Sequence, residues 1–259
     1  MENAWISLTN KKPLPYAIKL DENIQIPHIH DNATNPCDYA GDDISLFTKC
    51  ICIGDSLTSG TMNADGSTED GRKYVNIEKY SFPSNLERIT GITTVNKGLG
   101  GLSSLEWFNN QKDTDLSGFD MAIIQLGVND GIRYGEWGES SITGFTNIIN
   151  KLKNECKNIK IFVSTIIPAT SYSNDVFNEI SNGIRNLVTS LNDQNVILVD
   201  LALYGHTKDS TAYNCGHLSA YGYFRLAKDY KSFISYYIST HKENFKEVQF
   251  IGTDYISGY

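Results

Sequence analysis

The strongest constraint on the fold is an alternation along the chain between short β-branched apolar runs and longer stretches with helical periodicity. Five of the runs predict strands, at Lys49–Asp55, Thr93–Lys97, Met121–Leu126, Lys160–Ile167 and Val196–Asp200. Apolar residues three and four positions apart predict helices at Ser81–Thr90, Ser103–Asn109, Phe145–Cys156, Asp175–Leu191 and Ala220 to about Thr240. This order predicts βαβ units and therefore a parallel sheet with helices on both faces.

The chain is long enough for one sizeable core, and among its 259 residues there is no repeat or low-complexity tract. We expect one principal domain over residues 47–240. Residues 1–46 contain four of the six prolines and favour an N-terminal arm with one or two edge strands. Residues 241–259 form a tail in which the alternation around Glu247–Ile251 predicts a strand that pairs with the arm.

The balance of charge limits the partners of the chain. A formal net charge of −8 disfavours nucleic acid and anionic membrane surfaces, and it favours a small neutral molecule or a glycan. The longest apolar runs are too short to span a bilayer, and the N-terminus lacks the pattern of a signal peptide. The location stays open between the cytoplasm and export by another route. An odd number of cysteines predicts buried, reduced thiols at Cys37, Cys50, Cys52, Cys156 and Cys215.

Four short blocks stand at strand ends or just ahead of helices. In Gly-Asp-Ser-Leu a glycine turn presents Ser56 at a helix start, and in Asn-Lys-Gly-Leu-Gly-Gly the backbone exposes N–H donors around Gly101. Gly-Val-Asn-Asp brings the amide of Asn129 to the sheet edge, and Asn-Cys-Gly-His places His217 ahead of the last helix. Each block alone also fits a turn, a helix cap or a surface histidine. Together they predict one ligand site at the carboxyl edge of the sheet.

These blocks resemble those of the SGNH hydrolases, also called GDSL-type, over about residues 47–240. The resemblance implies a flavodoxin-like three-layer α/β/α sandwich with a five-stranded parallel sheet, no cofactor, and ester hydrolysis through an acyl-enzyme. Ser56 would be the nucleophile and His217 its base. The N–H groups of Ser56 and Gly101, with the side chain of Asn129, would form the oxyanion hole.

The chain departs from the family at one position. Members usually carry an Asp three residues before the histidine, where this chain has Asn214. An Asn there favours the wrong imidazole tautomer, and in serine proteases the analogous change lowers turnover by roughly 10⁴. We expect a working Ser56–His217 dyad whose ring is held by the side-chain oxygen of Asn214, by a backbone carbonyl or by Asp209.

The substrate is predicted from the loops around these blocks. Four polar or aromatic residues close to the oxyanion edge are candidate substrate-binding residues, namely Asp55, Arg133, Tyr134 and Trp137. Such side chains suit sugar faces and hydroxyls, although the aromatic ones equally suit packing of the loops onto the body. We expect removal of acetyl or another short acyl group from a carbohydrate, ahead of lipase, lysophospholipase or thioesterase activity. The alternative class is a non-catalytic glycan-binding or assembly module on the same scaffold.

A second motif, Ile-Pro-His-Ile-His-Asp-Asn, lies in the arm. Its residues His28, His30 and Asp31 offer ligand types that metals use. Two histidines and one carboxylate in a proline-flanked arm are usually just an exposed edge strand, and we expect no metal site.

Overall fold

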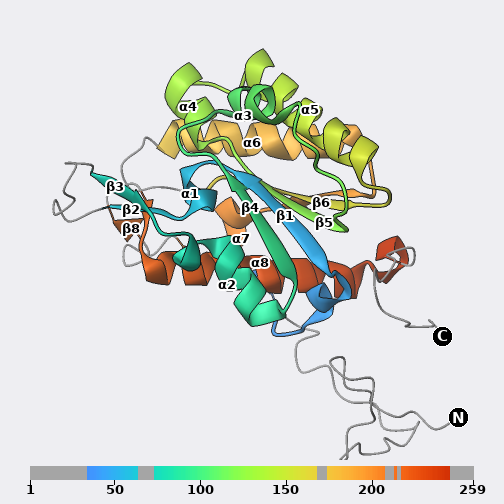
Figure 1. The fold of residues 1–259 in the computed structure, drawn as a ribbon. Coiled ribbons are helices and arrows are strands. Elements are labelled where there is room, and N and C mark those ends of the chain that lie inside the picture. The colour runs from blue at the N-terminus through green and yellow to red at the C-terminus, as the bar shows by residue number, and fades with distance from the viewer. Residues whose placement is uncertain (1–33, 64–72, 168–173, 208–212, 215–216, 246–259) are drawn as a thin grey trace, which may run out of the picture. The chain divides into compact units, whose positions relative to one another are not determined.

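The computed structural model describes residues 34–63, 73–167, 174–207, 213–214 and 217–245. A sheet of five parallel strands, in the order β4-β1-β5-β6-β7, forms its centre (Figure 1). The strands are β1 (Lys49–Gly54), β4 (Thr93–Gly98), β5 (Met121–Gln125), β6 (Lys160–Ser164) and β7 (Val196–Val199). This is the strand order of flavodoxin-like doubly wound sheets, and it confirms the predicted fold class.

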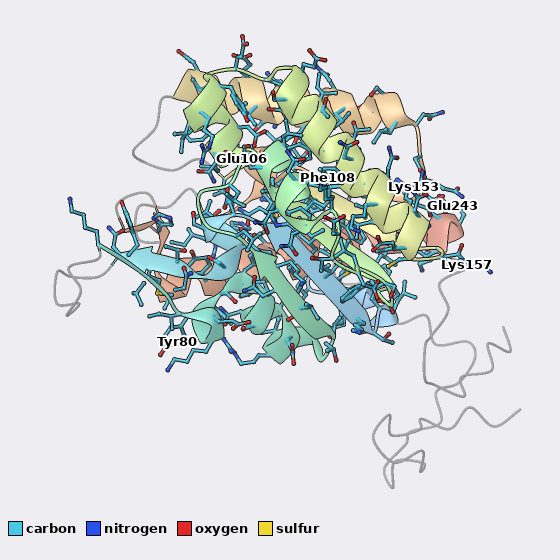
Figure 2. All side chains as sticks on the ribbon, turned by 45° about the horizontal axis from the view of Figure 1, so that its top comes forward. Tyr80, Glu106, Phe108, Lys153, Lys157 and Glu243 are labelled. Carbon is cyan, nitrogen blue, oxygen red and sulfur yellow. The ribbon has the colours of Figure 1, made fainter. Side chains whose placement is uncertain are left out.

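Helices cover both faces of this sheet (Figure 1). One face carries α2 (Phe82–Thr90) packed against α8 (Ala220–Thr240). The other carries α3 (Ser104–Gln111), α4 (Val128–Tyr134), α5 (Glu139–Glu155) and α6 (Asn174–Leu191). Lys153 and Lys157 project outward at the far end of α5 and just beyond it (Figure 2). No helix in the described ranges is both long and apolar enough to cross a membrane.

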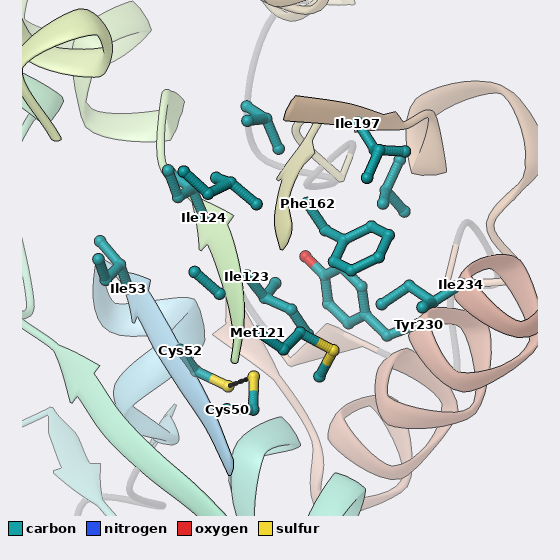
Figure 3. Close-up of a cluster of buried hydrophobic side chains, with 14 of the residues drawn as sticks. Cys50, Cys52, Ile53, Met121, Ile123, Ile124, Phe162, Ile197, Tyr230 and Ile234 are labelled. Atoms are coloured by element: carbon teal, nitrogen blue, oxygen red, sulfur yellow. Dashed lines mark hydrogen bonds between the residues drawn. The ribbon is translucent and has the colours of Figure 1, made fainter. Parts of the chain in front are cut away.

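The central strands are buried on both faces, which explains their continuous apolar sequences. Every residue of β5 and β6 is buried. Between the sheet and α8 lies a cluster that includes Met121, Phe162 and Tyr230 (Figure 3). In the same cluster the sulfur atoms of Cys50 and Cys52 are 3.8 Å apart and fully buried, as expected of reduced thiols.

On the face that carries α3 to α6, two helices differ from the sequence-based prediction. Helix α5 begins at Glu139, six residues before the expected Phe145, and α4 was not predicted at all. Both pack through small residues: a Cβ on Gly144 would lie 2.4 Å from the Leu105 nitrogen, and one on Gly131 would lie 3.0 Å from Val176. Contacts of this kind leave no apolar periodicity in the sequence. Strand β6 also ends at Ser164 rather than Ile167.

The described part of the expected arm is helical. Residues Pro36–Asp38 and Asp43–Leu46 form the 3₁₀ helices η1 and η2, and both pack on α8. The Ile44 N–H donates to Ser235 Oγ of that helix at 3.1 Å. At the other end of the chain, residues Lys242–Phe245 form η5. Several predictions fall on residues that the structure does not describe. They concern the motif of His28, His30 and Asp31, the edge strands before residue 34, the tail strand after residue 245, and Cys215.

Candidate active site

The site lies at the point where the chain changes direction in the sheet. From β1 the chain continues to β4 on one side, and it then crosses to β5 on the other side. In doubly wound sheets the crevice at the carboxyl ends of two such strands is the usual ligand site. Ser56 lies just after the end of β1, separated from it by Asp55, and Asn129 lies shortly after the end of β5. The hydroxyl of Thr58 donates to Gln125 Oε1 at 3.2 Å and ties these two strand ends together.

A tight turn positions Ser56 as the first residue of the short helix α1 (Ser56–Ser59). Asp55 caps this helix, since its Oδ1 accepts the N–H of Leu57 at 2.9 Å. The helix packs so closely on β4 that a Cβ on Gly98 would lie 2.3 Å from the Ser59 nitrogen. Gly98, the first glycine of the second sequence block, therefore allows α1 to approach the sheet closely.

His217 meets Ser56 across the sheet edge. The Nε2 atom of its imidazole lies 3.0 Å from Ser56 Oγ. His217 belongs to the two-residue strand β9 (His217–Leu218), and α8 begins after the cap residue Ser219. Burial holds the pKa of His217 below its ordinary value of 6.5. The neutral imidazole, which is the form able to accept a proton, therefore predominates at neutral pH.

The other ring nitrogen of His217 has a different environment. Its Nδ1 atom is buried and has no hydrogen-bond partner among the described residues. Asn214 pairs with His217 in the antiparallel register of β8 (Tyr213–Asn214) with β9. Asp209 lies outside the described residues. The predicted substitute for the usual Asp therefore stays a prediction.

The glycine turn after β4 runs beside Ser56. A Cβ on Gly100 would lie 3.8 Å from Ser56 Cβ. Gly101 has φ +76°, in the left-handed region, while nothing lies within 4 Å of the place where its Cβ would be. Glycine is therefore favoured at position 101 by the backbone conformation alone, and not by a lack of space for a side chain. The carbonyl of Gly101 accepts a hydrogen bond from Arg133 Nη2 at 2.8 Å.

Asn129 bridges this glycine turn and the turn that precedes Ser56. Its Nδ2 group donates to Leu102 O at 3.2 Å and to Asp55 Oδ2 at 3.1 Å. Burial raises the pKa of Asp55 to about 7, against the hydrogen bonds from Leu57 and Asn129 that lower it. Asp55 is only 1 % exposed, so its side chain supports Asn129 from inside the protein and does not face solvent.

The remaining substrate candidates occupy different environments. Arg133 also pairs with Glu106 of α3, with its Nε 3.0 Å from Oε2. The hydroxyl of Tyr134 lies 3.2 Å from Ser103 Oγ, and its side chain is partly exposed. The indole of Trp137 packs on Phe145, with ring centroids 5.5 Å apart, and covers Gly183 of α6. Two roles were considered for these aromatic residues, sugar binding and packing of the loops. The contacts of Trp137 fit the packing role.

One aromatic neighbour of His217 was missed at the sequence level. Tyr74 stands on β3 (Tyr74–Asn76), which forms an antiparallel hairpin with β2 (Thr61–Asn63). Its ring centroid is 4.9 Å from that of His217, and the two planes meet at 56°. No strand was predicted between Asp55 and the helix expected at Ser81. The alternation in Tyr-Val-Asn-Ile was the signal that could have predicted a strand.

A doubly wound sheet with a serine and a histidine joined at its carboxyl edge, beside a glycine turn and an asparagine amide, defines the SGNH class of hydrolases. The family model of the GDSL-like lipase/acylhydrolase family matches residues 52–225, and the chain belongs to this family. It is therefore a carboxylic ester hydrolase. The comparison with curated protein sequences finds no match.

Solved structures share the fold. A G-D-S-L family protein from Desulfitobacterium hafniense DCB-2 has a TM-score of 0.52 at 22% identity, over 71% of this chain and 98% of that one. A carbohydrate acetylesterase from Sinorhizobium meliloti has a TM-score of 0.56 at 16% identity, over 73% and 98%. A family two carbohydrate esterase from Clostridium thermocellum, in complex with cellohexaose, has a TM-score of 0.57 at 16% identity, over 76% and 65%.

Proposed function

We propose that the chain removes acetyl or another short acyl group from a carbohydrate, with Ser56 as nucleophile and His217 as general base. The observation that carries this proposal is the 3.0 Å contact between Ser56 Oγ and His217 Nε2. Ser56 Oγ attacks the ester carbonyl while His217 takes its proton, and His217 then returns the proton to the leaving alcohol. Water, activated by the same imidazole, releases the acyl group from Ser56.

The negative charge of each tetrahedral intermediate needs hydrogen-bond donors. We assign the N–H groups of Ser56 and Gly101 and the side-chain amide of Asn129 to this role. In the free protein Asn129 donates to the neutral carbonyl of Leu102 at 3.2 Å. An oxyanion forms a shorter and stronger, charge-assisted bond, so it can take that N–H from the carbonyl. Losing one such donor typically lowers turnover by about 10²–10³.

The imidazole works in this proposal without the usual Asp. Its Nδ1–H would be bound by the side-chain oxygen of Asn214, by a backbone carbonyl or by Asp209. Burial of Nδ1 supports a dedicated acceptor, because a buried N–H without a partner costs about 1–3 kcal/mol.

Charge and aromatic side chains support a carbohydrate substrate. The net charge of −8 favours a neutral substrate over an anionic one. Tyr74 and Tyr134 are 49% and 40% exposed, and each contacts a residue of the site or of the turn beside it. Exposed tyrosine rings suit the faces and hydroxyls of sugars. The structural neighbours from Sinorhizobium meliloti and Clostridium thermocellum are carbohydrate esterases.

Hydrolysis of p-nitrophenyl esters of increasing chain length, together with acetate release from an acetylated glycan, tests this function. We expect the acetyl ester to be preferred over the octanoyl ester in kcat/KM. The Ser56→Ala variant should lose about 10⁴-fold or more in kcat, whereas Ser190→Ala, an exposed serine of α6, should keep the parental rate. A fluorophosphonate should label Ser56 alone. Preference for the octanoyl ester would favour a lipase, and hydrolysis unaffected by Ser56→Ala would favour a non-catalytic module.

A further inference from the structure

One face of β3 contacts His217 and the short helix α1 that begins with Ser56. Tyr74 and Asn76 are two residues apart, so their side chains project from the same face of the strand. The ring of Tyr74 packs on His217. The Oδ1 atom of Asn76 accepts hydrogen bonds from Ser59 Oγ, at 3.3 Å, and from Thr61 Oγ1. Ser59 belongs to α1, the helix that begins with the predicted nucleophile.

The base of this hairpin is firmly held. The N–H of Ile77 donates to Gly60 O at 3.0 Å, which fixes the end of β3 to the end of α1. On the paired strand, the hydroxyl of Tyr223 donates to Thr61 O at 2.6 Å. Tyr223 is fully buried and belongs to α8, the helix that follows His217. The hairpin is therefore tied to the segments that carry both proposed reactive groups.

The reaction creates a cation on His217 that needs stabilisation. When the imidazole takes the serine proton it becomes positive, and no carboxylate among the described residues bonds to its Nδ1. A cation within about 6 Å of an aromatic centroid is attracted by the ring quadrupole. The 4.9 Å separation of the Tyr74 and His217 centroids lies within that range. The same contact restricts rotation of the imidazole away from Ser56 Oγ.

We propose that Tyr74 is a positioning residue, whose ring holds the imidazole of His217 toward Ser56 and stabilises the imidazolium formed during acyl transfer. This inference rests on the proposed function and deepens it. The aromatic ring is the required group, and the Tyr74 hydroxyl is dispensable. Among the described residues, Ser56 hydrogen-bonds the imidazole and Tyr74 packs against it.

Kinetics of two Tyr74 variants and one matched control test the inference. Tyr74→Phe keeps the ring, and Tyr74→Leu keeps an apolar cover without the ring. The control is Tyr80→Leu, which removes a similarly exposed tyrosine from η3 (Glu78–Tyr80), on the outer side of the protein (Figure 2). Thermal melting should show all three folded.

On p-nitrophenyl acetate, we expect Tyr74→Phe and Tyr80→Leu to stay within about twofold of the parental kcat. Tyr74→Leu should lower kcat by about 5- to 30-fold at unchanged KM, since a desolvated cation–π contact is of this order. A raised KM for p-nitrophenyl acetate at unchanged kcat would show that Tyr74 contacts substrate without positioning His217, and it would overturn the inference. Equal losses in the Phe and Leu variants would overturn it too, because the hydroxyl would then be the required group.

A second readout does not depend on turnover. The His217 ring is titrated by NMR in the Ser56→Ala background, with its signals assigned by comparison with His217→Gln. Because the Tyr74 ring favours the charged imidazole, Tyr74→Leu should lower the His217 pKa and Tyr74→Phe should leave it unchanged. A raised or unchanged His217 pKa in Tyr74→Leu would show that the Tyr74 ring only shields the imidazole from solvent, and it would overturn the inference. The expected pKa change without ester hydrolysis by the parent would overturn the proposed function and leave the contact supported.

Discussion

Asn129 and Arg133 lie four residues apart on α4 and bind two successive carbonyl groups, those of Leu102 and Gly101. Residues at this spacing share one face of a helix. That face therefore supplies one proposed oxyanion donor, the amide of Asn129, and also fixes the turn that supplies another, the N–H of Gly101. The geometry of the two donors is coupled through α4.

Removing the guanidinium of Arg133 should disturb this coupling. We expect Arg133→Gln to lower kcat by about tenfold, of the order of one hydrogen bond from a charged donor, while stability changes little because the side chain is 45% exposed. Arg88→Gln on α2 is the matched control, since its Nη2 bonds only Asn85 of its own helix among the bonds described. Steady-state kinetics decide, and parental kcat in Arg133→Gln would refute the coupling.

Alanine substitutions at two glycines can distinguish the effect of backbone strain on stability from an effect on catalysis. Gly91, which caps the end of α2, and Gly101 both have φ +76°, and neither has an atom within 4 Å of an added Cβ. Alanine at either position should cost about 1–2 kcal/mol of stability through the same backbone strain. We expect Gly101→Ala alone to lower kcat, by tenfold or more, because it shifts an oxyanion donor. Denaturant unfolding and kinetics measure the two effects, and equal kcat in both variants would remove Gly101 from the oxyanion hole.

The pH dependence of hydrolysis reports on His217. Burial lowers the pKa of His217, and in the proposed mechanism its imidazole acts as a base only when neutral. The value of kcat/KM should therefore rise with pH and reach half of its plateau below the ordinary histidine value of 6.5. Rates on p-nitrophenyl acetate between pH 4 and 8 give this midpoint. A midpoint clearly above 6.5 would mean that the charged imidazole is favoured in the free enzyme.

Stability should depend on pH through Asp55. Its folded pKa is about 7, whereas an unfolded Asp titrates near 3.9. Between these values the folded state holds a proton that the unfolded state has released, so the contribution of Asp55 to stability falls as pH rises from about 4 to 7. We expect the unfolding free energy of Asp55→Asn, relative to the parent, to be higher at pH 8 than at pH 5. Urea unfolding measures it, with the exposed Asp113→Asn as a control that should show no such change.

The position of the usual Asp offers a direct test of the dyad. If a substitute acceptor already holds the ring of His217, Asn214→Asp should change kcat by less than about tenfold. Single-turnover and steady-state rates on the acetyl ester measure this. A rise of several orders of magnitude, as expected from repair of a wrong tautomer, would show that the natural enzyme is impaired.

The sheet and the four sequence blocks could be predicted because local patterns encode them. Apolar runs mark the buried strands, and the glycine turns follow β1 and β4 directly. The strand order came from the resemblance, since periodicity does not specify it. Helix α4 and the start of α5 were missed because glycines make their contacts. The approach of Tyr74 to His217 joins distant parts of the chain, so no local pattern could reveal it. Nor could the sequence decide between a packing and a binding role for Trp137.

The packing of η1 and η2 on α8 bears on how the enzyme can be shortened. A chain cut before residue 47 would keep every sequence block of the family. It would also expose the core where the fully buried Ile44 packs, leave Ser235 Oγ without the Ile44 N–H, and remove the contact of Asp38 with His206. The helix that would lose these contacts is α8, which begins just after His217. Trimming to the recognisable motifs would therefore loosen the support of the proposed proton acceptor, His217, while leaving every proposed reactive group in place.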